Sequence, residues 1–478
     1  MAIRLRRSIQ AAETEVKVRR LSSFKVGKLF GEYDYFIPMN VEEHITAIIA
    51  PNGYGKTLCL RMIDALFAGR WSIFVEYSFT EVEFTFTDNS KIILNKENKK
   101  DDPDFATTIG LKIVAITPSG TKSAPWRPRA IDSKTSYQLE RYLPFLTRIG
   151  PNVWTHDQTG ESYTLQQVVE NFGDSIPPHI AEQIFGKVPA AISDLIEKVD
   201  CHLIETQRLL VMHKISDSRE FRINGRRPAP VLAISKKAQT LKTVIADQLT
   251  AYAALSQSLD RSFPRRVISQ QSSIPEDELK KKLDVLDEKR QRLMGAGILD
   301  TEVDDPVSFP SGPMEPAISR VLSVYADDTE EKLGSLSKLL ARISLFRELV
   351  NERFVTKDIH VNRDNGIDVS FNGKPVPLEK LSSGEQHQLV LFFELLFEID
   401  ENSLILIDEP ELSLHVSWQK KFISDLKKII KLNKFDSIIA THSPQLIGRW
   451  QSLVVELGDV EEDVDNYIDS KEEKGFIQ

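Results

Sequence analysis

Cysteine is scarce in this chain, which contains only two cysteines among 478 residues. Cys59 and Cys201 are far apart in the sequence and lack the short spacing that is typical of zinc ligands. Small secreted folds that depend on several disulfide bonds are therefore excluded as a class. We expect both residues to be thiols in a reducing compartment.

Long apolar runs are also missing from the sequence. No stretch approaches the roughly 18–20 consecutive apolar residues that are needed to cross a bilayer. The charged start, residues 1–7, is not followed by the apolar core of a signal peptide. The sequence therefore predicts a cytoplasmic protein without a membrane partner.

The chain has no excess of positive charge, since its formal net charge is −9. This balance argues against a protein that coats nucleic acid generally, because such binding needs a concentrated basic surface. Short basic clusters occur at residues 19–20, 127–129 and 265–266. They are usually solvated faces, but they leave a local contact with nucleic acid or an acidic partner open.

A glycine-rich turn at residues 50–57 is the strongest signal in the first half of the chain. The turn follows an apolar, strand-like run at residues 45–49 and precedes a helical pattern that begins at residue 58. This order favours a nucleotide phosphate loop, in which backbone N–H groups face the phosphates. We assign the phosphate cradle to Asn52, Gly53 and Gly55, a phosphate charge contact to Lys56, and Mg²⁺ binding to the Thr57 hydroxyl.

One position departs from the usual phosphate-loop pattern, because Ala50 stands where the first glycine is expected. Alanine disfavours positive φ, so a left-handed residue required at this position would be strained. We expect the change to be tolerated, since Gly53 and Gly55 remain at the closest approach to the phosphates. The alternative is an ordinary strand–turn–helix connection with an incidental Gly-Lys-Thr.

Two further strand-like runs end in polar residues near the C-terminus. Residues 404–407 precede Asp408 and Glu409, and residues 437–440 precede Thr441 and His442. An acidic pair at a strand end suits a Mg²⁺ ligand, Asp408, and a carboxylate that orients and deprotonates the attacking water, Glu409. His442 is a candidate contact for the γ-phosphate, although acidic pairs and single loop histidines also occur as purely structural features.

The segment Ser382-Ser383-Gly384-Glu385 predicts the start of a helix. Ser382 and Glu385 have the spacing of a capping box, which is a sufficient structural explanation by itself. A helix start with a serine hydroxyl and free N–H groups also binds anions, so it can hold a phosphate. Gln207, after a strand-like run at residues 202–204, is either a ligand for Mg²⁺ or the attacking water, or an edge-strand glutamine.

Together these motifs resemble the ABC-type ATPase heads of the SMC, RecF and OLD families. The segments that carry the resemblance are residues 50–57, 204–209, 381–385, 404–415 and 441–442. The resemblance implies an α/β P-loop NTPase head with a mixed sheet, an antiparallel β subdomain and a long helical insertion. It also implies ATP and Mg²⁺ as cofactors, Gln207 as the Q-loop glutamine, and His442 as the switch histidine. The signature at Ser382, Ser383 and Gly384 would act on the ATP of a facing subunit, in a homodimer or higher homo-oligomer.

Within these families the chain looks most like the Septu-type ATPases of prokaryotic antiphage defence. OLD nucleases continue into a TOPRIM domain, whereas only about thirty-five residues follow His442 here. The resemblance therefore implies an ATPase that lacks a nuclease site and controls a partner nuclease of the HNH type. A RecF- or SMC-like DNA-repair ATPase that binds duplex DNA with ATP remains the alternative, and a transporter subunit fits less well.

The expected organisation divides the chain into four parts. Residues 1–210 form the first part of the ATPase head with a β-rich and helical subdomain, and residues 211–354 form a helical insertion. Residues 355–457 complete the head with the signature, the acidic pair and His442, and residues 458–478 are an acidic tail.

Overall fold

The computed structural model describes most of the chain, with gaps. The described residues are 18–97, 109–129, 139, 142–143, 145–150, 153–157, 160–172, 182, 185–205, 210–211, 231–270, 274–300, 314–354 and 356–458. Gln207 and all of the predicted acidic tail except its first residue lie outside this part of the chain.

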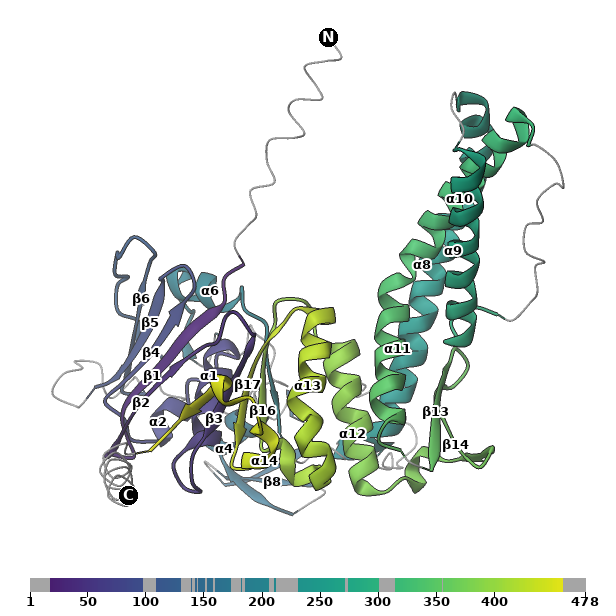
Figure 1. Cartoon of the computed structure of the whole chain (residues 1–478). Helices are drawn as coiled ribbons and strands as arrows, with labels where there is room; N and C mark the ends of the chain where they lie inside the picture. The colour runs from purple at the N-terminus through teal and green to yellow at the C-terminus, as the bar shows by residue number, and fades with distance from the viewer. Residues whose placement is uncertain are drawn as a thin grey trace, which may run out of the picture.

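A five-stranded sheet forms the centre of the head, in the order β10-β16-β17-β3-β18 (Figure 1). All four strand pairings in it are parallel. Successive residues of β16 belong to different hydrophobic clusters, because alternate side chains point to opposite faces of a sheet. Both faces are covered, as parallel sheets require. The strands are β3 (Ile45–Ile49), β10 (Cys201–Ile204), β16 (Leu404–Asp408), β17 (Asp436–Thr441) and β18 (Val454–Glu456).

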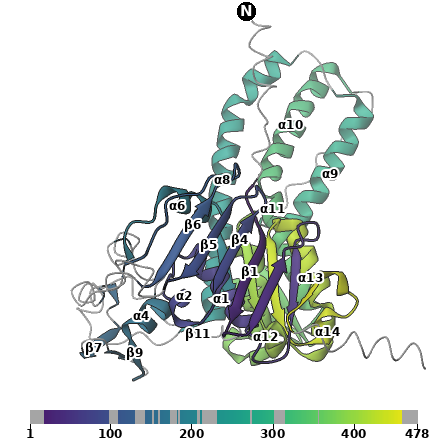
Figure 2. The same ribbon diagram turned by 90° about the vertical axis from the view of Figure 1, so that its left-hand side faces the viewer.

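An antiparallel sheet lies on one side of the central sheet, in the order β2-β1-β4-β5-β6. Figure 2 shows it in front of the arm, and helix α1 (Lys56–Phe67) shares its hydrophobic cluster. The alternating burial of β4 and β5 matches their alternating sequence. The elements are β1 (Leu21–Leu29), β2 (Tyr33–Pro38), α2 (Ile73–Glu76), β4 (Glu81–Phe86), β5 (Lys91–Lys96) and β6 (Leu111–Ile116).

Two helices, α12 and α13, cover the other face of the central sheet. Alternate side chains of β16, Ile405 and Ile407, join their hydrophobic cluster. The elements on this side and after the last strands are α12 (Ser383–Phe393), the π-helical turn η3 (Glu394–Glu398), the 3₁₀ turns η2 (Leu378–Lys380), η4 (Pro410–Ser413) and η5 (Gln451–Leu453), α13 (Val416–Asn433) and α14 (Pro444–Ile447).

Four helices form an arm that projects from the head in both views (Figures 1 and 2). They are α8 (Ala233–Ser269), α9 (Glu276–Gly295), α10 (Pro316–Ser335) and α11 (Ser337–Asn351). Pro264 lies inside α8, and Leu336 separates α10 from α11. None of the described helices combines the length and apolar character that a membrane span requires.

Smaller elements lie around the head and at the base of the arm. The hairpin β13–β14 packs on α11 and α8 at the base of the arm (Figure 1). The predicted fold class, a P-loop α/β head with an antiparallel sheet and a helical insertion, is confirmed. The central sheet was expected to be mixed, but its described strand pairings are all parallel. The remaining elements are β7 (Leu146–Gly150), β8 (Val153–His156), β9 (Ser162–Thr164), α4 (Leu165–Phe172), α6 (Ala190–Ile196), β11 (Leu210–Val211), β12 (Val231–Leu232), β13 (Lys357–Asn362), β14 (Gly366–Phe371) and β15 (Lys374–Val376).

Candidate nucleotide site

The glycine-rich turn connects β3 to α1, as the sequence predicts. Gly53 and Gly55 adopt φ values of 91° and 83°, which glycine reaches without the strain that a Cβ atom causes. A Cβ on Gly55 would lie 3.1 Å from Leu29 Cδ2 and 3.2 Å from Phe30 Cε2, so the turn also packs tightly at this point. Ala50 is not among the residues with positive φ, and its difference from glycine therefore causes no backbone strain.

Lys56 and Thr57 begin the helix that follows the turn. Lys56 is only 5% exposed, and its Nζ donates to the carbonyl oxygens of Ala50, at 2.7 Å, and of Pro51, at 3.1 Å. The ammonium group is therefore held inside the loop. The N-terminal end of α1 adds the partial positive charge of its unpaired N–H groups to the same place.

Asp408 stands at the end of β16, next to the helix start. The Thr57 hydroxyl donates to Asp408, with 3.1 Å between Oγ1 and Oδ1, although the two residues are 351 positions apart. Burial raises the pKa of Asp408, the Thr57 hydrogen bond opposes this effect, and the negative charge of Glu409 adds to it. A hydroxyl and a carboxylate side by side are the oxygen ligands that Mg²⁺ prefers.

Glu409 turns sharply away from the line of β16. Its φ of 43° lies in the left-handed region, which costs a non-glycine residue about 1–2 kcal/mol. The backbone N–H of Glu409 donates to the Ala440 carbonyl oxygen at 2.9 Å, which ties this turn to the neighbouring strand β17. Strained conformations of this kind persist where the surrounding structure holds a functional side chain in place.

His442 lies directly after β17 and faces two carboxylates. Its Nδ1 is 3.5 Å from Glu409 Oε1 and also 3.5 Å from Glu411 Oε1. Its backbone N–H donates to the same Glu411 oxygen at 2.9 Å. The three residues come from the ends of two adjacent parallel strands, β16 and β17.

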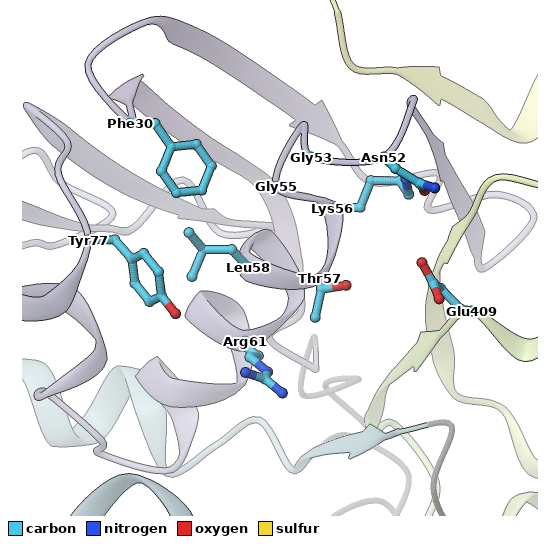
Figure 3. Close-up of a pocket in the computed structure, with 10 residues that line it drawn as sticks. All are labelled: Phe30, Asn52, Gly53, Gly55, Lys56, Thr57, Leu58, Arg61, Tyr77 and Glu409. Carbon is cyan, nitrogen blue, oxygen red and sulfur yellow. The ribbon is translucent and has the colours of Figure 1, made fainter. Parts of the chain in front are cut away.

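A pocket of about 310 Å³ opens at this place (Figure 3). Lys56, Thr57 and Glu409 line one side, while Phe30 and Tyr77 lie on the other side with their ring centroids 6.2 Å apart. The full lining consists of Phe30, Asn52, Gly53, Gly55, Lys56, Thr57, Leu58, Arg61, Tyr77 and Glu409. Its charged side suits phosphates, and its aromatic side suits an apolar or aromatic group.

The signature residues lie elsewhere. Ser382 is the N-cap of α12 and forms the predicted capping box: Glu385 N–H donates to the Ser382 hydroxyl, and the Ser382 N–H donates to Glu385 Oε2 at 2.8 Å. Lys357 of β13 pairs with the same Glu385 side chain at 2.6 Å. Neither Ser382, Ser383 nor Gly384 is among the residues that line the pocket.

Sequence reasoning missed several residues of the site. Phe30 and Tyr77 carry no motif, and nothing in the residues around them places their rings at the glycine-rich turn. Glu411 follows the acidic pair by two positions, but nothing in its spacing indicates that it reaches the next strand. Gln207 remains a prediction, since it lies outside the described residues. Arg61 in the pocket is paired with Glu205 at 3.3 Å.

Comparison with protein families gives one match that covers half of the chain. The family is described as an AAA ATPase domain, and it matches residues 209–447. This region contains the signature segment, Asp408, Glu409 and His442, while the glycine-rich turn lies upstream of it.

Two curated proteins are similar over short segments. Protein ea59 of Escherichia phage lambda is 33% identical over 112 residues, which are 23% of this chain and 20% of the relative. The probable ATPase of retron Ec83 from Escherichia coli is 34% identical over 89 residues, which are 16% of this chain and 16% of the relative. The chain thus matches no more than a fifth of the length of these relatives.

Solved structures of SMC head domains are similar at a low level. The Pyrococcus furiosus head with an extended coiled coil, bound to the C-terminal domain of ScpA, has a TM-score of 0.29 and 11% identity, covering 95% of this chain and 100% of that one. The Thermotoga maritima SMC head has a TM-score of 0.29 and 10% identity, covering 90% and 91%.

Proposed function

The chain belongs to the family of AAA ATPase domains, and from this premise we propose that it binds and hydrolyses ATP as the sensor and scaffold subunit of a prokaryotic antiphage complex. In this proposal, its nucleotide state controls a partner nuclease of the HNH type. One observation carries the ATPase part. Groups from two distant parts of the chain meet here: Lys56, Thr57 and Glu409 line one pocket. Asp408 contacts Thr57, and His442 lies beside Glu409.

Each of these side chains suits one task in phosphoryl transfer. The Lys56 ammonium and the start of α1 attract the phosphates, and Thr57 and Asp408 would hold Mg²⁺, which neutralises phosphate charge when it is bound. Glu409 orients the attacking water and accepts its proton, since its carboxylate lines the pocket beside the loop. His442, next to Glu409, contacts the γ-phosphate.

The place of the signature supports a dimer as the active unit. Ser382, Ser383 and Gly384 begin a helix whose N-terminal N–H groups suit an anion, yet they do not line the pocket of their own chain. In this proposal the signature that contacts ATP comes from a second copy, as in the ATPase heads that the sequence resembles. The homodimer places two nucleotides between two heads.

The defence role is supported by two similar proteins and by the sequence resemblance. One similar protein is the probable ATPase of a retron from Escherichia coli, and another is encoded by Escherichia phage lambda. Related segments therefore occur both in a bacterium and in a phage of the same bacterial genus. The partner nuclease is proposed because the sequence resembles ATPases that act together with one.

Nucleotide binding is tested by calorimetry on wild type and on Lys56→Ala. We expect Lys56→Ala to lose ATP binding, because the buried ammonium is the only side-chain cation of the glycine-rich turn. Lys374→Ala, at an exposed position of β15, is the control and keeps wild-type affinity. Equal ATP affinity in wild type and Lys56→Ala contradicts the assignment of this site.

Dimer formation is tested at the N-cap of α12. Ser382→Asp and Ser382→Asn both retain a good N-cap, but only aspartate places a negative charge against a phosphate. We expect Ser382→Asp to abolish ATP-dependent dimers, measured by light scattering in a Glu409→Gln background. In that background we expect ATP to bind without hydrolysis, because the proposed general base is removed. Ser382→Asn still dimerises, and both variants bind ATP as monomers. Identical dimerisation of the two variants overturns the role given to the signature.

The nuclease partner is tested by affinity purification from the native host, followed by a nuclease assay on the recovered complex. We expect a co-purifying nuclease whose activity differs between wild type and Lys56→Ala. Recovery without any nuclease, or with a nuclease that is indifferent to Lys56→Ala, removes this part of the proposal. ATP-dependent DNA binding by the isolated chain would instead favour the DNA-repair alternative.

A further inference from the structure

Glu411 is a buried carboxylate that the proposed reaction does not yet use. It lies in η4, two residues after Glu409, and it is only 6% exposed. Its Oε1 accepts two hydrogen bonds from the end of β17, one from the Thr441 hydroxyl at 2.7 Å and one from the His442 backbone N–H at 2.9 Å. Its Oε2 is buried without a hydrogen-bond partner among the described residues.

This arrangement is costly for a residue that serves packing alone. A buried acceptor without a partner costs about 1–3 kcal/mol. Among the described residues Glu411 forms an ion pair only with His442, at 3.5 Å, and with no lysine or arginine. An apolar side chain would fill the same space without this cost. We therefore attribute the carboxylate at this position to its hydrogen bonds with residues 441–442.

A second bridge joins the same two segments. Gln419, in the first turn of α13, donates from Nε2 to the carbonyl oxygens of Glu411, at 3.3 Å, and of Leu414, at 3.2 Å. Its Oε1 accepts from the Ser443 hydroxyl at 2.8 Å. His442 is therefore held on both sides, through Thr441 by Glu411 and through Ser443 by Gln419. The turn after Glu409 and the loop around His442 form one connected unit.

We propose that Glu411 is a positioning residue that holds His442 toward the γ-phosphate, with Gln419 as a second support. This inference rests on the proposed function, because it assumes that ATP occupies the pocket. The carboxylate acts through its two hydrogen bonds to residues 441–442, so the acceptor matters more than the charge. Glu411 touches no nucleotide itself.

The readout is the ratio of affinities for a non-hydrolysable ATP analogue and for ADP, measured by calorimetry. ADP lacks the γ-phosphate, so a misplaced His442 weakens only the analogue. We expect Glu411→Met, which keeps the length but removes the acceptor, to weaken the analogue about tenfold and to leave ADP unchanged, a loss equal to one strong hydrogen bond. Glu411→Gln retains an acceptor, so we expect its ratio of analogue affinity to ADP affinity to be close to that of wild type.

A double variant separates positioning from general damage. If Glu411 acts through His442, then Glu411→Met combined with His442→Ala is no worse than His442→Ala alone. Gln419→Met gives a partial loss of the same ratio and serves as the test if Glu411→Met does not fold. Glu401→Gln, an exposed carboxylate paired with Lys338, is the control without effect.

The outcomes distinguish this inference from the proposed function. The inference is overturned if folded Glu411→Met, or Gln419→Met in its place, keeps the wild-type affinity ratio. It is also overturned if Glu411→Gln lowers the ratio as much as Glu411→Met does. A double variant whose loss of affinity is the sum of the two single losses overturns it as well. Wild type that binds both nucleotides equally also overturns it, since His442 then contacts no γ-phosphate. Failure of the proposed function looks different, because neither nucleotide binds or Lys56→Ala binds as wild type does.

Discussion

Thr57 and Asp408 are joined by a hydrogen bond of 3.1 Å between residues 351 positions apart in the chain. The hydroxyl belongs to the first turn of α1, and the carboxylate ends β16. The contact brings the glycine-rich turn to the acidic pair, and the entire arm lies between them in the sequence. Residues between Phe30 and Tyr77 line most of the pocket, and Glu409 completes it, so the site is whole only when both parts of the head have assembled.

The raised pKa of Asp408 predicts how nucleotide binding depends on pH. Burial favours the protonated carboxyl, and the neighbouring Glu409 charge adds to this effect. A protonated carboxyl does not bind Mg²⁺, so the affinity for Mg·ATP should fall as the pH is lowered. Because the pKa of Asp408 is raised, we expect this fall to begin at a higher pH than it would with an exposed aspartate as the ligand. Calorimetric titrations from neutral to mildly acidic pH check this result. Affinity that is flat over this range contradicts it.

The raised pKa of Asp408 has the opposite effect on the stability of the ligand-free protein, which should fall as the pH rises. A carboxyl whose folded pKa is raised binds more protons in the folded state, so stability falls as the pH rises through the interval between its unfolded and folded pKa values. We expect Asp408→Asn to remove this loss. Its unfolding free energy should equal that of wild type at low pH and exceed it at neutral pH, as measured by urea denaturation. A variant that is less stable than wild type at neutral pH would refute this prediction.

Gly53 and Gly55 offer a matched pair of substitutions in the phosphate loop. Both have positive φ, so alanine costs about 1–2 kcal/mol in conformation at either position. Only at Gly55 would the new Cβ also crowd Leu29 and Phe30, because nothing lies within 4 Å at Gly53. We expect Gly55→Ala to lower both the melting temperature and ATP affinity more than Gly53→Ala does. Equal effects in thermal melts would show that the tight contact is unimportant.

The sequence predicts the parts of this site that depend on local structure. The strands that end at Asp408 and Thr441, and the capping box of Ser382 and Glu385, depend on periodicity and spacing within a few residues. Glu411 was missed because its partners are Thr441 and His442, about thirty positions away, and strand order alone brings them together.

The arm shows the same limit of local reasoning. Proline usually ends a helix because it lacks an N–H group and clashes with the preceding turn. Pro264 nevertheless lies inside α8, close to its C-terminal end. There Arg266 of the same helix pairs with Asp328 of α10 and also donates to the Leu259 carbonyl oxygen. These contacts within α8 and between α8 and α10 support the last turns of α8. A short stretch of sequence around Pro264 does not include Asp328, so local patterns do not reveal this support.

The aromatic side of the pocket predicts a contribution to nucleotide affinity. Phe30 is 41% exposed and therefore adds little to the core, but it lines the pocket beside Tyr77. Stacking of a base on an aromatic ring contributes about 1–3 kcal/mol, or roughly 5- to 150-fold in affinity. We expect Phe30→Ala to weaken ATP binding within this range without a change in melting temperature. Phe36→Ala, at a 59% exposed phenylalanine of β2 outside the pocket lining, is the control. Similar affinities of both variants would remove Phe30 from the site.

A buried ion pair joins the base of the arm to the head. Arg353, just after α11, pairs with Asp425 of α13, and both side chains are only 2% exposed. The guanidinium group also lies 4.8 Å from the centre of the Phe392 ring in α12. The pair thus connects the returning arm helix to both helices that cover the central sheet.

Breaking this pair should destabilise the head strongly. Arg353→Met leaves the Asp425 carboxylate buried without its partner, which costs about 3–5 kcal/mol. Combining it with Asp425→Leu removes both charges and should restore most of the loss. Lys428→Met is the matched control, because the exposed pair of Lys428 and Glu348 links the same two helices and contributes about 0–1 kcal/mol. Urea denaturation at neutral pH measures all three variants.

The pH dependence of that loss follows from the charge of Asp425. Burial raises the pKa of this carboxyl, and Arg353 opposes the shift. Without Arg353 the pKa rises further, and the protonated form no longer needs a cationic partner. The destabilisation by Arg353→Met should therefore be small at acidic pH and grow as the pH rises toward neutrality. A loss that is constant over this range would mean that Arg353 stabilises the head by packing on Phe392 and not by its charge.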